Sequence, residues 1–438
     1  MKSGIFPAGP HYTAPVPGAL TAFAGRPAAD SVASGSAAAR ESAYAANPWL
    51  VPGTTDASHR LAGVLDVGSR ADSVVVTLEG DDRTGYRMKD FDRTYHAMKG
   101  LTSGDPLRML FGIPATLYLG VEAIVPQLDG PRDVFTRLIT RHPQGGRAKQ
   151  VLSSMERVPQ PDLLIDAGDM VFNGRRGRLW EEWVDQHREL RSRVPLVAAP
   201  GNHERIHDPV AQTNWNLCVG LPAQPRRYWY ALDLPDSLAR FVILDSNPLS
   251  DVKHNFPDAL EEQLSDEQLS WCDSVLATRA RYRFVVLHHP LVSMGHYPRE
   301  WLPDSAGDPV PVRRARLLEI CSRRGVTAIL AGHEHLYYRV FLRRADRSGF
   351  WHITSGGGGG PLYPIDAKNL RREQARTQPA GLALDAATAW VVSKYHFCRL
   401  VLLKQPGGPL RFDVYESLRG GKIRLIQRFD LSRPPGGS

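Results

Sequence analysis

The fold is decided by the stretch Leu196-Val197-Ala198-Ala199-Pro200-Gly201-Asn202-His203-Glu204. It begins with an apolar run, passes through a Pro-Gly turn and ends in an amide, an imidazole and a carboxylate. A short apolar run bounded by Pro and Gly predicts a buried strand. In open α/β sheets, ligands bind just beyond the carboxyl ends of such strands. We therefore expect Asn202, His203 and Glu204 to lie at a binding site.

Three further apolar runs, at residues 163–165, 284–287 and 326–330, are each followed by a turn and then by a metal-capable side chain. Repetition of this order within one chain favours a shared site over coincidence, because each such ending alone is common. The side chains that follow the three runs are Asp169, His288, and the pair His333 and His335.

Amphipathic segments lie between these runs and predict helices at residues 148–158, 178–191, 265–277 and 312–323. Strands that alternate with helices indicate an α/β fold in which helices cover a sheet. The region from the glycine run 356–360 to about residue 390 is predicted to be loop. Further strands are predicted at residues 63–65, 73–78, 241–244, 396–403, 410–415 and 423–429.

The composition changes along the chain and predicts three regions. Residues 1–58 are rich in Ala, Pro, Gly and Ser without periodicity, which is typical of a disordered arm. Residues 59–130 predict either a small β domain or an elaborated edge of the main domain. Residues 131–432 carry the α/β pattern and predict the main domain.

The bulk composition is that of a globular chain of 438 residues with 42% hydrophobic and 23% charged residues. No run approaches the roughly 18 apolar residues of a membrane helix, and no secretory signal is visible. A cytoplasmic protein that does not contact a membrane is expected. The four cysteines form no C-x-x-C pair and are predicted to be buried free thiols. The sequence does not predict an oligomeric state.

The net charge of +8 and a pI near 9.3 permit a nucleic-acid partner. The basic residues are dispersed, however, and their clusters are short. A solvated basic surface is favoured, and an anionic substrate that benefits from a positive field is the second interpretation.

The donor types favour a centre of two divalent cations, which clamps the attacking and leaving oxygens of a displacement at phosphorus. Imidazole suits zinc or iron, whereas carboxylate and amide oxygens suit harder ions such as manganese. Asp169 is the candidate for a carboxylate that bridges the two ions. His333 and His335 are one residue apart, so a turn would let each of them serve a different ion.

Four sequence blocks together resemble the calcineurin-like metallophosphoesterases, in the order and rough spacing of that superfamily. The resemblance extends over about residues 135–430 and implies a β-sandwich flanked by helices, with a dinuclear centre at one edge. It also implies phosphoester hydrolysis by a metal-bound hydroxide. The blocks are Gly168-Asp169, Gly201-Asn202-His203-Glu204, His288 and Gly332-His333-Glu334-His335.

The resemblance assigns a role to each matching position. Asp169 bridges the metals; one ion is held by Asn202, His288 and His333, and the other by His335. His203 is catalytic and not a ligand, because in the family this position stabilises the transition state or protonates the leaving group.

Residues 337–339 (Tyr-Tyr-Arg) and Ser355 resemble purple acid phosphatases and their bacterial relatives. Phe172 stands where those enzymes carry a metal-bound Tyr, which makes ferric iron less favoured.

The superfamily's first block, Asp-x-His or Asp-x-Gly after the first strand, has no clear counterpart. No Asp-x-His occurs before Asp169. The two candidates for the missing ligand are Asp129 and His142. Asp66 fits Asp-x-Gly but would require a long insertion before the next block.

Neighbouring residues are predicted to support the site. Asp166, Glu204 and Glu334 are expected to orient the ligands, although Glu204 could equally face solvent. His289 is interpreted as a buried or supporting residue. The glycine run 356–360 is either a flexible turn or a place where backbone approaches the site closely.

The sequence thus predicts a metal-dependent phosphoester hydrolase, either a phosphomonoesterase or a phosphodiesterase, that uses two divalent ions (Mn, Zn or Fe). Its partner would be a phosphorylated substrate. Two alternatives stay open: a non-catalytic scaffold with a degraded first metal site, and a nuclease.

Overall fold

The structure of the chain is a computed structural model. Backbone alone is described at 50–52, 62–65, 146, 205 and 258–264. Asp129 and His142 are not among the residues that the structure describes. The described residues are 72–82, 146–174, 176–205, 214–215, 218–219, 228–249, 258–294, 309–365, 372–373, 377 and 380–432.

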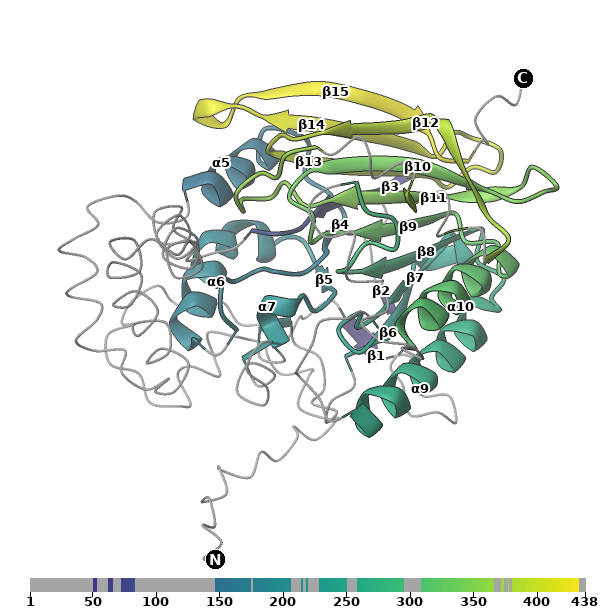
Figure 1. Cartoon of the computed structure of the whole chain (residues 1–438). Helices are drawn as coiled ribbons and strands as arrows, with labels where there is room; N and C mark the ends of the chain where they lie inside the picture. Colours follow the sequence, from purple (N-terminus) through teal and green to yellow (C-terminus); the bar gives the residue numbers. More distant parts are fainter. Residues whose placement is uncertain are drawn as a thin grey trace, which may run out of the picture.

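Two β-sheets pack face to face and carry helices on their outer sides (Figure 1). The six-stranded sheet has the order β15-β14-β13-β3-β4-β5 and carries α5 and α6. Its elements are β3 (Ser73–Glu79), β4 (Leu163–Asp166), β5 (Leu196–Ala198), β13 (His396–Leu403), β14 (Arg411–Ser417), β15 (Ile423–Asp430), α5 (Gly146–Met155), α6 (Gly177–Arg191) and, after β5, the short α7 (Asn202–Arg205).

The nine-stranded sheet has the order β1-β2-β6-β7-β8-β9-β11-β10-β12, and α9 and α10 cover it. Its strands are β1 (Leu50–Pro52), β2 (Ala62–Leu65), β6 (Tyr230–Asp233), β7 (Ala239–Ile243), β8 (Tyr282–Leu287), β9 (Ala328–Ala331), β10 (Tyr337–Arg343), β11 (Gly349–Ser355) and β12 (Ala383–Val392). The helices are α9 (Asp258–Leu276) and α10 (Val310–Arg323), and two 3-10 turns lie at Pro235–Ser237 and Arg419–Gly421.

The layered packing explains why the central strands are continuous apolar runs. In β8, Phe284 and Val286 belong to the core cluster that joins the two sheets, whereas Val285 and Leu287 belong to the cluster beneath α9 and α10. Successive side chains of a strand point to opposite faces, so a strand buried on both faces carries no polar alternation. The predicted α/β sandwich with flanking helices is confirmed, and all four cysteines are buried and free as expected.

β3 lies inside the six-stranded sheet, where it pairs with β13 and runs parallel to β4. The chain between residues 59 and 130 therefore contributes a central strand to the main sandwich. Within the predicted disordered arm, Leu50–Pro52 form β1, which pairs with β2 at the edge of the other sheet. The remainder of residues 1–58 lies outside the described residues.

The prediction of loop up to residue 390 was wrong for β12, which covers Ala383–Val392. This strand is partly exposed, so its apolar and polar positions do not alternate regularly, and pairing with β10 stabilises it. None of the described helices is both long and apolar enough to cross a membrane.

Two parallel strand groups bring their carboxyl ends to a common edge. β3, β4 and β5 form one group, and β7, β8 and β9 form the other. The loops that leave these ends carry the polar side chains singled out in the sequence.

Candidate metal centre

The structure brings together the five residues predicted to hold the metals, each on a loop that follows a strand. Asp169 follows β4, His288 follows β8, and His333 and His335 follow β9. Asn202 opens α7 directly after the β5 turn. Asp169 and His333 have φ angles of 60° and 68°, in the left-handed region that a residue other than glycine adopts at a cost. Both turns aim their side chains at the same place.

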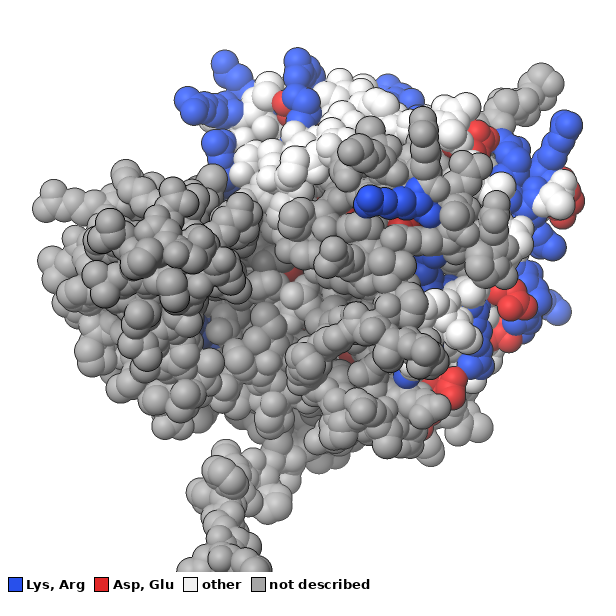
Figure 2. Space-filling view, viewed as in Figure 1, with Lys and Arg blue, Asp and Glu red and all other residues white. Residues whose placement is uncertain are grey.

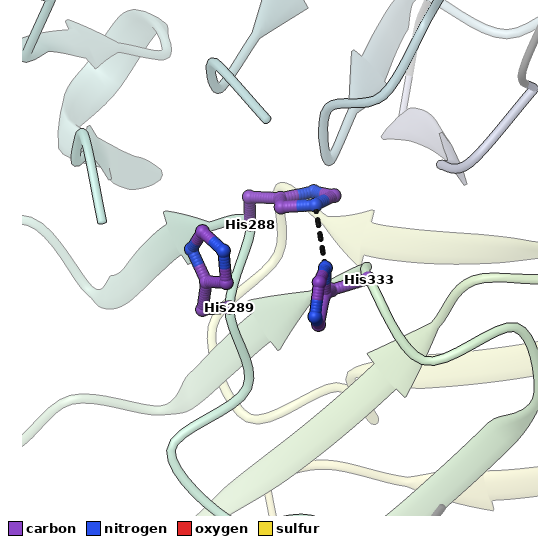
Figure 3. Close-up of side chains that lie close together, drawn as sticks. All are labelled: His288, His289 and His333. Carbon is purple, nitrogen blue, oxygen red and sulfur yellow. Dashed lines mark hydrogen bonds between the residues drawn. The ribbon is translucent and has the colours of Figure 1, made fainter. Parts of the chain in front are cut away.

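His288 is the meeting point of one half of the site. Its Nε2 lies 3.1 Å from Asn202 Oδ1, 3.3 Å from Asp169 Oδ2 and 3.0 Å from His333 Nδ1. Figure 3 shows the rings of His288 and His333 turned toward each other, with His289 beside them. Nδ1 of His288 lies 2.8 Å from the carbonyl oxygen of Ala167, so it carries a proton and donates it there. Nε2 is thus the nitrogen left to accept a cation.

The groups around His288 change the pKa of its ring. The ring is fully buried, and burial alone would lower its pKa. The charge and hydrogen bond of Asp169, with further help from Asp81, instead raise the pKa of His288 to about 9. Such a shift shows that the site favours positive charge, whether a proton or a metal ion supplies it.

Asp81 completes the other half of the site and was missed in the sequence. It lies two residues beyond the end of β3, and its Oδ1 is 3.5 Å from Nε2 of His335. Both atoms are buried and make no hydrogen bond. Oδ2 of Asp81 accepts the backbone N–H of His333 at 2.6 Å. One potential ligand atom each of Asp81, Asp169 and His288 lies within 4.8 Å of the others.

A signal for Asp81 was available in the sequence. The strand at residues 73–78 was predicted, and a turn and a carboxylate follow it, as at the other strand ends. Asp81-Asp82-Arg83 matches neither Asp-x-His nor Asp-x-Gly, the two forms expected of the first block. Asp129 and His142, the candidates put forward instead, lie outside the described residues.

The glycine run fixes His335. Nδ1 of His335 lies 2.6 Å from the carbonyl oxygen of Pro361, and the ring stacks on Tyr363 with centroids 4.2 Å apart. A Cβ on Gly360 would lie 2.7 Å from Cε1 of His335. On Gly358 it would lie 2.4 Å from the carbonyl oxygen of Gly80, with which the Gly358 N–H is hydrogen-bonded. The close backbone approach considered for this run is therefore confirmed.

His203 lies at the edge of the cluster and is half-buried. Its backbone N–H donates to Oδ1 of Asp169 at 2.9 Å. Its Nδ1 lies 2.6 Å from the carbonyl oxygen of Phe172, and the centroids of the two rings are 5.3 Å apart. Phe172 therefore orients the His203 ring through its main chain, while its own side chain is 39% exposed.

Glu204 is fully buried and holds the turn that carries Asp169. Its carboxylate accepts the N–H groups of Asp169 at 2.7 Å, Gly201 at 2.8 Å and Val171 at 3.2 Å. Burial and the neighbouring charge of Asp169 raise the pKa of Glu204 to about 7. Of the two interpretations of Glu204, support of the site is correct and exposure to solvent is wrong.

Two other residues named for support are also buried. Asp166 accepts the N–H of Gly168 at 2.8 Å, and Glu334 accepts the N–H of Met294 at 3.0 Å together with the hydroxyl of Ser293. His289 is buried, its Nδ1 pairs with the hydroxyl of Ser246 at 2.8 Å, and its ring lies 4.6 Å from that of His333.

Comparison with known proteins agrees with this arrangement. Residues 133–337 match the family model described as calcineurin-like phosphoesterase. A protein of Arabidopsis thaliana named "Probable inactive purple acid phosphatase 1" is 23% identical over 49% of this chain and 36% of its own length. A barley protein (Hordeum vulgare) named "Nucleotide pyrophosphatase/phosphodiesterase" is 22% identical over 48% of this chain and 60% of its own length.

Among solved structures, a purple acid phosphatase from yellow lupin seeds has the same fold. The TM-score is 0.50 at 15% sequence identity, over 85% of this chain and 58% of the lupin chain. The chain matches between a third and two thirds of the length of these relatives. The resemblance predicted from the sequence is confirmed by the match of residues 133–337 to the calcineurin-like phosphoesterase family model.

Proposed function

We propose that this protein is a metal-dependent phosphoester hydrolase whose centre holds two divalent cations. The observation that carries the proposal is the pair formed by Asp81 Oδ1 and His335 Nε2. Both atoms are buried without a hydrogen bond, 3.5 Å apart, beside the convergent donors around His288. A buried polar atom without a partner is costly, and a shared cation removes the cost.

The ring orientations fit the proposed ligands. In His288 and in His335, Nδ1–H donates to a backbone carbonyl, which leaves Nε2 as the atom that faces the site. Carbonyl partners of this kind fix the tautomer of metal-binding histidines in general. Asn202, His288 and His333 would hold one ion, His335 and Asp81 the other, and Asp169 would lie between them.

Two divalent cations bound at this position would lower the pKa of a water molecule and neutralise charge on the phosphoryl oxygens. The chain's own residues position the ester and supply a proton to its leaving oxygen. Since Nδ1 of His203 is held by Phe172, the other ring nitrogen, Nε2, is the one that holds or delivers a proton. When the P–O bond of the ester breaks, we assign that proton to the leaving oxygen, a role worth about 10²–10⁴-fold in rate.

The scaffold alternative drew its support from the missing first block. Asp81 stands at the end of the first strand of the six-stranded sheet and faces His335, which favours the enzyme. The name of the Arabidopsis relative includes the word inactive, so activity has to be measured.

The nuclease alternative drew its support from the basic pI. Figure 2 shows Lys and Arg side chains of the described residues spread along the rim of this face, with Asp and Glu among them. A nucleic-acid surface would concentrate positive charge in a patch or stripe.

Turnover of purified protein on three substrates tests the proposal. An aryl phosphomonoester, a bis-aryl phosphodiester and single-stranded DNA should be compared in the presence of Mn²⁺, with metal content measured on the same preparation. At least two ions per chain and hydrolysis of either aryl ester support the enzyme. One ion or none, with no hydrolysis, supports the scaffold, and selective cleavage of DNA supports the nuclease.

His203→Ala tests the assigned proton donor. The variant should keep both ions, because His203 is not among the proposed ligands, and should lose about 10²–10⁴-fold in rate. The loss should shrink for esters whose leaving group is acidic, because such a group departs without a proton. Unchanged turnover on all esters would remove His203 from the mechanism.

A further inference from the structure

A second cluster of ligand-type side chains lies behind Asp81, where the end of β3 meets α6. Glu79, Asp82 and His187 are 1%, 3% and 2% exposed. One ligand atom from each lies within 4.8 Å of the others. None of these residues belongs to the centre described above, and the predictions from sequence did not include them.

The His187 ring is locked so that one nitrogen faces the two carboxylates. Its Nδ1 lies 3.0 Å from the carbonyl oxygen of Trp183 and donates its proton there, while the Trp183 ring stacks on it at 4.1 Å. Nε2 then lies 3.3 Å from Asp82 Oδ2 and 3.7 Å from Glu79 Oε1. A neutral imidazole would therefore point its lone pair at two carboxylate oxygens.

The negative charge of this cluster lacks a fixed counter-charge. Oε1 of Glu79 is buried and makes no hydrogen bond, and the same is true of Oδ2 of Asp166. Asp166 stands opposite Glu79 in the parallel register of β3 and β4. Among the described residues, no Lys or Arg lies within ion-pair distance of Glu79 or Asp82. Ionised buried carboxylates without a counter-charge are strongly disfavoured, so either bound protons or a cation must balance them.

We propose that Glu79, Asp82 and His187 bind a third divalent cation of the zinc class, separate from the two at Asp169. Zinc bonds of about 2.0–2.2 Å in tetrahedral geometry separate neighbouring ligand atoms by about 3.4 Å, close to the spacing seen here. One imidazole and two carboxylates are ligands that zinc accepts. The ion would tie α6 to the end of β3, next to the residue that faces His335.

Zinc stoichiometry tests this site. The protein is loaded with Zn²⁺, freed of excess metal by gel filtration and analysed for metal per chain. Glu79→Gln and His187→Gln, which nearly preserve side-chain volume, should each bind one zinc ion fewer than the wild-type protein. Glu181→Gln, on the exposed face of the same helix, is the matched control and should bind as many as the wild type.

Asp169→Asn separates this site from the proposed centre. With the bridging carboxylate removed, one zinc ion per chain should remain, and Asp169→Asn/His187→Gln should retain none. The proposal is overturned if Asp169→Asn retains no zinc, or if Glu79→Gln and His187→Gln both bind as much zinc as the wild type. The second result would show that protons, not a metal, balance the buried charge. Failure of the dinuclear centre alone would leave the one-ion difference intact.

Discussion

The two halves of the candidate metal centre differ in how the chain builds them. The donors of the His288 half come from sequence motifs that were recognised directly. Their atoms lie 3.0–3.3 Å from Nε2 of His288. The His335 half pairs one motif residue with Asp81, which comes from a strand outside residues 133–337, the range that matches the family. A site can therefore be half encoded in contiguous motifs and half assembled by a distant strand.

The largest effect should come from the residue that the two halves share. Asp169→Asn is expected to abolish hydrolysis and to empty both metal positions, because Asp169 is the proposed bridge between them. The fold should persist, since Asn tolerates the left-handed conformation that Asp169 adopts at φ 60°. Metal content and turnover, measured beside a melting curve, check this. Retention of an ion that the additional change His187→Gln does not remove would show that the halves load independently and that Asp169 does not bridge.

A smaller loss should be confined to the His335 half. Asp81→Asn removes a charged ligand of one ion. Loss of a residue that only orients a ligand lowers metal affinity by about 10–100-fold, so the loss here should be larger. The ion beside His288 should stay bound. Metal titration of the variant against the wild type gives the two affinities separately.

Asp129→Asn and His142→Asn are the informative comparisons for Asp81→Asn. These residues were the candidates put forward from sequence for the same ligand. If Asp81 holds the second ion, both variants should titrate as the wild type does. Loss of the second ion in either of them, with Asp81→Asn unaffected, would make Asp129 or His142, and not Asp81, the missing ligand.

Sequence reasoning predicted the His288 half because each of its residues follows its own apolar run within a few positions. Asn202 and His288 needed only the rule that ligands collect at the carboxyl ends of strands. The α/β sandwich followed from the same runs, since strands such as β8 are buried on both faces and show as continuous apolar segments.

Asp81 could not be placed in the same way, although its strand was predicted. Nothing local shows that β3 lies between β13 and β4, because the pairing with β13 joins residues more than 300 positions apart. The role of the glycine run was open for the same reason. Its small residues matter only because Gly80 and His335 pack against them. Strand β12 was missed because its partial exposure blurs the pattern.

The smallest change that should distinguish the two halves is a single methyl group at Gly360. A Cβ there would lie 2.7 Å from Cε1 and 2.9 Å from Nδ1 of His335, so the ring must move away from Pro361 and Asp81. Gly360→Ala should weaken the ion at His335 by about 10–100-fold, as loss of an orienting partner does, and leave the ion at His288 unchanged. Activity should recover when more metal is added. Gly177→Ala is the control, because nothing lies within 4 Å of a Cβ at that position. Equal weakening of both ions by Gly360→Ala would show that the halves are mechanically coupled, and the division drawn between them would then fail.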